Sequence, residues 1–110
     1  MRIFLMLAAM PLSLLTSAAF AQENGNPGSG RAYAVAHCAE CHAVTEATAL
    51  SPNPDAPNFA SVALQPGMTG HALAVWLQTS HPTMPNFVIP PADQDNIIAY
   101  ILSLRPPAKP

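Results

Sequence analysis

Apolar residues recur at helical spacing in three segments of the chain, and these segments predict three helices. The first helix is expected over residues 31–41, which are rich in alanine, with Ser29 or Gly30 near its N-cap. The second helix is expected over residues 70–79, where Thr69 suits the N-cap position. Little in the rest of the chain has the alternating pattern of a β-strand.

The second and third predicted helices each carry an apolar stripe. The third helix is expected over residues 91–104, with Pro91 tolerated in its first turn. The proline-rich segments 43–60 and 81–90 are expected to be a loop and an extended segment. The stripe residues are Leu73, Trp76 and Leu77 in the second helix, and Ile97, Ile101 and Leu104, flanked by Ile98 and Tyr100, in the third.

The N-terminal residues 1–21 have the composition of a secretory signal peptide. Arg2 gives a short positive region, residues 3–15 are almost entirely apolar, and residues 19–21 form a small-x-small cleavage site. The apolar run is shorter than the about 18 consecutive residues that indicate a membrane-spanning helix. We therefore expect a periplasmic protein with no transmembrane anchor after signal cleavage.

The 89 residues that remain are expected to form one small domain. Residues 22–29 are expected to be a flexible leader, residues 30–105 the domain, and residues 106–110 a proline-rich tail. Three basic and six acidic side chains give this part a net charge of −3. Without a basic patch to neutralise phosphates, the chain is not expected to bind nucleic acid.

The motif that indicates the chemistry is Cys38-Ala39-Glu40-Cys41-His42. Two thiols two residues apart, followed directly by an imidazole, form the attachment pattern for a c-type haem. The thiols of Cys38 and Cys41 can add to the two vinyl groups of the porphyrin, and His42 can then ligate the iron as the proximal ligand. We expect these three side chains to project from one helical turn and to hold one covalent haem c.

Other functions of a Cys-x-x-Cys pair fit the chain less well. A thioredoxin-like redox pair requires a β-α-β setting, and a structural zinc site requires four ligands, which the chain does not offer in a second cluster. A simple disulfide would leave His42 without a role. In an oxidising compartment a free dithiol would not be expected to persist.

The sixth iron ligand is predicted to be Met84. Prolines on either side stiffen its extended segment, and a thioether opposite a histidine raises the reduction potential. Met68 is the other methionine after residue 21, and an unassigned methionine is usually core filler. His81 and His71 are bis-histidine alternatives. His37 is expected to be a surface residue, because it directly precedes the attachment motif.

With these residues in place, the chain resembles the small monohaem class I c-type cytochromes over Gly30 to Leu104. Gly30 matches the small residue that lets the N-terminal helix approach the C-terminal helix. Ala34 departs from the family, because many members carry an aromatic residue there. The resemblance implies an all-α fold in which three main helices surround one haem and leave one porphyrin edge exposed.

The resemblance also implies roles for three further residues. The carbonyl of Pro57 would accept a hydrogen bond from His42, which fixes the orientation of the imidazole. Trp76 would pack against the haem from the middle helix. Tyr100 would pack beside the haem and the N-terminal helix.

The function implied is electron transfer rather than enzymatic catalysis, because His42 and Met84 would fill both axial positions and no nucleophile or general base is apparent. The partners would be a redox protein donor and acceptor. Either a periplasmic shuttle or a cytochrome subunit docked to a catalytic dehydrogenase or oxidase fits the sequence. A five-coordinate gas sensor or peroxidase-like protein would require Met84 to lie away from the iron.

Overall fold

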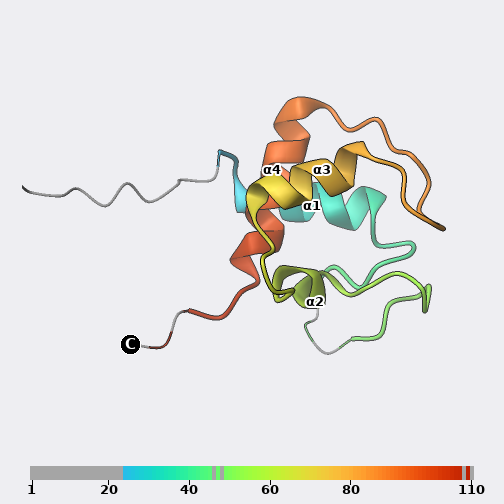
Figure 1. The fold of residues 1–110 in the computed structure, drawn as a ribbon, viewed down its shortest axis with the longest axis horizontal. Coiled ribbons are helices and arrows are strands. Elements are labelled where there is room, and N and C mark those ends of the chain that lie inside the picture. Colours follow the sequence, from blue (N-terminus) through green and yellow to red (C-terminus); the bar gives the residue numbers. More distant parts are fainter. Residues whose placement is uncertain (1–23, 46, 48, 108, 110) are drawn as a thin grey trace, which may run out of the picture.

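The computed structural model describes residues 24–45, 47, 49–107 and 109, and the predicted signal peptide lies outside them. The described part of the chain contains no β-strand, which agrees with the predicted all-α class. None of its helices is long and apolar enough to cross a membrane. Its four helices are α1 (Pro27–His37), α2 (Phe59–Ala63), α3 (Gly70–Gln78) and α4 (Pro91–Ser103) (Figure 1).

Helix α1 begins and ends earlier than predicted. Asn26 is its N-cap, and the Asn26 side chain accepts a hydrogen bond from the Ser29 amide at 2.9 Å. Pro27 occupies the first helical position, where its missing N–H costs nothing. The helix ends at His37, so the predicted bounds of 31–41 were wrong at both ends. The last three residues of the predicted leader belong to the helix.

Helices α3 and α4 lie where they were predicted. The Thr69 hydroxyl caps α3 by accepting the Ala72 amide at 3.1 Å. Helix α4 begins at Pro91 and ends one residue before the predicted end, with Leu104 as its C-cap. The short helix α2 was not predicted, although Asn58 caps it through the Ser61 amide.

Helices α1 and α4 cross in close contact, as the resemblance implied. A Cβ atom on Gly30 would lie 1.9 Å from the backbone oxygen of Asn96, so only glycine permits this approach. The Asn96 side chain also accepts a hydrogen bond from the Asn26 amide at 2.7 Å. The start of α1 is therefore fixed to α4 by both packing and a hydrogen bond.

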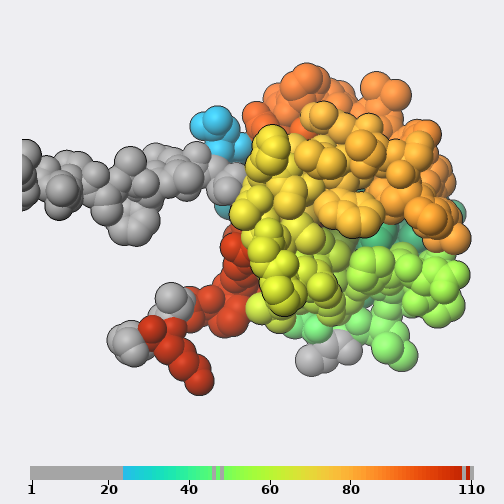
Figure 2. All heavy atoms as spheres, in the orientation of Figure 1, coloured from blue at the N-terminus to red at the C-terminus, as the bar shows by residue number. Residues whose placement is uncertain are grey.

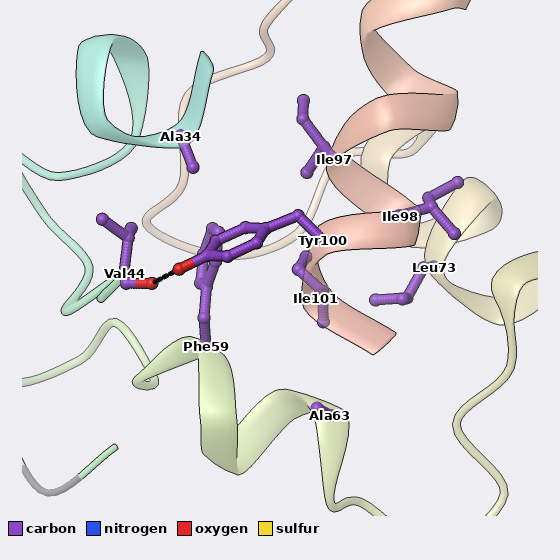
Figure 3. Close-up of a cluster of buried hydrophobic side chains, with 9 residues drawn as sticks. All are labelled: Ala34, Val44, Phe59, Ala63, Leu73, Ile97, Ile98, Tyr100 and Ile101. Carbon is purple, nitrogen blue, oxygen red and sulfur yellow. Dashed lines mark hydrogen bonds between the residues drawn. The ribbon is translucent and has the colours of Figure 1, made fainter. Parts of the chain in front are cut away.

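The hydrophobic core gathers where α4 meets α1, α2 and α3 (Figure 3). Ala34 is fully buried, so the small residue that departs from the family pattern lies in close packing. The Tyr100 hydroxyl donates to the Val44 carbonyl at 2.5 Å, which joins α4 to the segment just after the attachment motif. The core residues are Ala34, Val44, Phe59, Ala63, Leu73, Ile97, Ile98, Tyr100 and Ile101.

Arg105 joins the end of α4 to the connection between α2 and α3. Its Nε atom donates to the Ala63 carbonyl at 2.8 Å, and its guanidinium also donates to the Met68 carbonyl. One of the few cations of the chain is thus used to hold the backbone beside the core.

Candidate haem site

The attachment motif lies in the turns that directly follow α1. Cys38 is the C-cap of the helix, and its carbonyl accepts the amides of Cys41 at 3.2 Å and His42 at 2.9 Å. The bond from the His42 amide to the Cys38 carbonyl is the i+4 to i bond of one helical turn, so the three residues lie on a single turn as expected, although this turn follows the last residue of α1. Cys38, Cys41 and His42 line one cavity, and neither cysteine is in a disulfide.

His42 is oriented by the predicted hydrogen bond to Pro57. The distance from His42 Nδ1 to the Pro57 carbonyl oxygen is 2.6 Å. A carbonyl oxygen can only accept, so Nδ1 carries the proton and Nε2 keeps its lone pair. This tautomer is the one that a metal-ligating histidine requires.

Residues that the sequence analysis did not single out support the His42 region. The Phe59 ring lies 5.2 Å from the His42 ring, between ring centres, at an angle of 55°. The Asn58 side chain donates to the carbonyls of Ala47 and Ala49, both at 3.0 Å, while its oxygen caps α2. Asn58 thereby holds the loop after the motif. Its place before an apolar run was the signal that could have revealed this cap.

Met84, His81 and Trp76 form a second group at the same cavity. The distance from His81 Nε2 to Met84 Sδ is 2.9 Å. The Trp76 and His81 rings meet edge to face with their centres 5.1 Å apart. Trp76 is 49% exposed, so its ring borders the cavity and also reaches the surface. The structure therefore brings the predicted distal ligand and the predicted haem-packing residue together.

The other candidate ligands differ from Met84 in their surroundings. Met68 also lines the cavity, but it packs against the hydrophobic core. His71 is exposed and does not line the cavity. His37 is exposed and lies beside Tyr33 at the cavity border, with ring centres 4.3 Å apart. Of the two methionines among the described residues, Met68 packs against the hydrophobic core and Met84 does not.

The cavity has a volume of about 780 Å³. This is within the range of about 300–1,000 Å³ that is usual for cofactor and ligand sites. Its walls come from the attachment segment, the loop before α2, α2 itself, α3, the segment 81–89 and α4. Figure 2 shows the orange atoms of the 81–89 segment and the green atoms of the loop bordering one face of the molecule. Its lining of thiols, an oriented imidazole, a thioether and aromatic rings fits a covalently attached haem.

Tyr100 does not line this cavity. Its ring lies in the core, and its Cβ would be 2.8 Å from a Cβ added to Gly30. The expected packing against the N-terminal helix is therefore present. A contact between Tyr100 and haem stays a prediction.

The electrostatics of the attachment segment differ from those of a redox-active dithiol. Burial raises the pKa of the Cys38 thiol, whereas catalytic Cys-x-x-Cys pairs have a lowered thiol pKa. Burial, with smaller contributions from Asp93 and Cys38, also raises the pKa of the Tyr33 phenol. Together with the lack of strands among the described residues, this argues against the thioredoxin-like alternative.

Comparison with known proteins identifies the family. No family model and no solved structure matches the chain significantly. The chain is 42% identical over 79 residues to the cytochrome c-552 of Bradyrhizobium diazoefficiens, and the matched part covers 72% of this chain and 75% of the relative.

The family indicated by this relative is consistent with three features of the chain: its all-α fold, its Cys-x-x-Cys-His motif and the cavity beside that motif. The chain belongs to the small class I c-type cytochromes, proteins that carry electrons between redox partners, and it holds haem c covalently through Cys38 and Cys41.

Proposed function

We propose that the protein is a periplasmic monohaem electron carrier whose iron is ligated by His42 and Met84. The observation that carries the proposal is that both side chains line one cavity, each with a lone-pair atom available. Bound haem c supplies a one-electron Fe(II)/Fe(III) couple. The chain's own residues orient the ligands, exclude water and shape the docking surface.

The orientation of His42 supports its role as the proximal ligand. Its Nδ1–H is held on the Pro57 carbonyl and its ring face is restricted by Phe59, so Nε2 is presented in a fixed direction. Fixed ligands favour electron transfer, because the protein then rearranges little when the iron changes charge. The thioether of Met84 favours Fe(II) and raises the reduction potential.

The periplasmic location is supported by the sequence of residues 1–21, which has the features of a secretory signal peptide. We propose that the protein shuttles between a redox donor and a redox acceptor and is not itself an enzyme. A docked subunit of a larger oxidoreductase is the second candidate. The exposed side chains of Phe87 and Val88, 49% and 98% accessible, favour an apolar contact with a partner in either case.

The ligand assignment is tested by replacing each methionine. The ferric parent protein at neutral pH is expected to show the weak long-wavelength band that a sulfur–iron bond produces. Met84→Ala should abolish this band and lower the reduction potential, because the thioether that stabilises Fe(II) is lost. Met68→Ala is the matched control and should leave the band in place, since Met68 packs against the core.

Absorption spectra and redox titrations of the three purified proteins measure both effects. Loss of the band in Met68→Ala, with retention in Met84→Ala, would show that the ligand is Met68. Co-purification of the native protein with a second polypeptide would favour the subunit of a larger oxidoreductase over the shuttle.

A further inference from the structure

The segment that carries Met84 brings two side-chain atoms of metal-ligating type, a nitrogen and a sulfur, to the same point of the cavity. His81 Nε2 and Met84 Sδ are only 2.9 Å apart. A thioether sulfur carries no proton, so the contact would be a hydrogen bond only if Nε2 carried one.

The other nitrogen of His81 offers the ring proton a second acceptor. His81 Nδ1 is 3.3 Å from the Thr79 carbonyl oxygen, which can only accept a hydrogen bond. With the proton on Nε2 the ring donates a hydrogen bond to the Met84 sulfur. With the proton on Nδ1 it donates to Thr79 instead, and the Nε2 lone pair is free to ligate a metal. In this second tautomer His81 has the arrangement of His42, with Nδ1 on a backbone carbonyl and Nε2 available as a ligand atom. A histidine held in this way through its remote nitrogen is oriented as a metal ligand.

The backbone keeps the two side chains together. His81 and Met84 pair as an isolated antiparallel bridge around the two turn residues Pro82 and Thr83. The Trp76 ring packs edge to face on the His81 ring and limits its rotation. Both His81 and Met84 are half-buried and line the cavity.

From this geometry we propose that His81 is a reserve distal ligand, which takes the sixth iron position when the Met84 sulfur is removed. This inference rests on the proposed ligation by His42 and Met84. It assigns to the segment 81–84 two alternative ligands of different chemistry, a thioether and an imidazole. Loss of the thioether would then give a low-spin bis-histidine haem and not an open coordination site.

The experiment compares four proteins with haem attached: the parent, Met84→Ala, Met84→Ala/His81→Phe and Met84→Ala/His71→Ala. His81→Phe keeps a ring beside Trp76 but removes the nitrogen. His71→Ala removes an exposed histidine that does not line the cavity. The thioether bonds retain the haem in every variant, so each can be read by ferric absorption, electron paramagnetic resonance and titration with imidazole.

Met84→Ala is expected to lose the sulfur band and remain low-spin. Met84→Ala/His81→Phe is expected to become high-spin and to bind added imidazole at least about tenfold more tightly than Met84→Ala, because no internal ligand competes. Met84→Ala/His71→Ala should behave like Met84→Ala alone.

A Met84→Ala protein that is high-spin and binds imidazole as tightly as the His81→Phe double variant would overturn the inference and leave the Met84 assignment intact. A parent protein that lacks the sulfur band and has a bis-histidine spectrum would instead overturn the proposed Met84 ligation, and the reserve role with it.

Discussion

At the scale of single residues, Thr83 has a backbone conformation that its side chain does not favour. Its φ angle is 70°. Among the described residues, Thr83 is the one non-glycine residue with a positive φ angle. A β-branched residue in this region is strained by about 1–3 kcal/mol. The turn that brings His81 and Met84 together is therefore locally unfavourable at Thr83, and the surrounding structure must stabilise it.

Replacing Thr83 with glycine is expected to leave the free energy of unfolding unchanged or to raise it by up to about 2.5 kcal/mol. Glycine removes the strain at positive φ, and this gain offsets the greater freedom of glycine in the unfolded chain, about 0.5–1 kcal/mol. Chemical denaturation of the haem-containing protein measures the effect.

Thr45→Gly is the matched control, since Thr45 is exposed and does not have positive φ. It should lower the free energy of unfolding by about 0.5–1 kcal/mol. Equal losses in the two variants would mean that Thr83 is not strained.

At the scale of elements, the crossing of α1 and α4 organises the fold, and its contact point is Gly30. Gly30→Ala places a Cβ where the Asn96 carbonyl oxygen stands, 1.9 Å away. The helices must separate, so we expect a loss of about 1–3 kcal/mol in the free energy of unfolding, measured by thermal or chemical denaturation.

Gly28→Ala on the same helix is the control, because its added Cβ would meet only the Asn26 side-chain oxygen, at 3.2 Å. Gly28 is exposed, and alanine there gains helix propensity. If Gly30→Ala were as stable as Gly28→Ala, the crossing would be looser than the structure indicates.

The helices could be predicted to different degrees. α3 and α4 followed from apolar stripes and, in α3, from the cap at Thr69, because these signals are local. α1 began four residues before its predicted start, since Asn26 and Pro27 form a start signal that the glycine-rich composition of the leader obscured. α2 has only five residues, too few for a periodic pattern, and its only local signal was the Asn58 cap.

The parts of the candidate site that are formed by neighbouring residues in the sequence could be predicted. The attachment motif and the proline-flanked Met84 could be read directly, and the Pro57 hydrogen bond came from the family resemblance. The contact of His81 with Met84 could not be predicted, because it depends on the turn at Thr83 and on where Trp76 packs. Likewise, only the packing of α4 shows that Tyr100 lies in the core and not at the cavity.

At the scale of the whole molecule, the surface near the cavity is poor in positive charge. Among the described residues, Glu40 and Asp55 line the cavity and no lysine or arginine does. Arg105 is engaged with backbone carbonyls, and Lys109 lies beyond the end of α4. Docking of a redox partner should therefore depend on shape and apolar contact more than on long-range attraction.

The rate of electron transfer with the physiological partner is accordingly expected to change less than about threefold between low and physiological ionic strength. Stopped-flow kinetics over this range measure it. A Glu40→Lys/Asp55→Lys variant adds positive charge at the cavity and should introduce a clear salt dependence. A parent rate that falls tenfold or more with added salt would contradict the expectation.

The pairing of α1 with α4 also has a consequence for the order in which the protein matures. Fifty-three residues separate the two helices, and closing a loop of this length costs conformational entropy before any helix contact repays it. Haem bonded to Cys38 and Cys41 offers the intervening segments one apolar surface on which to collapse, which brings the distant helix near. We therefore expect the polypeptide to fold around haem that is already attached, so that haem attachment is itself the step that commits the chain to its native structure.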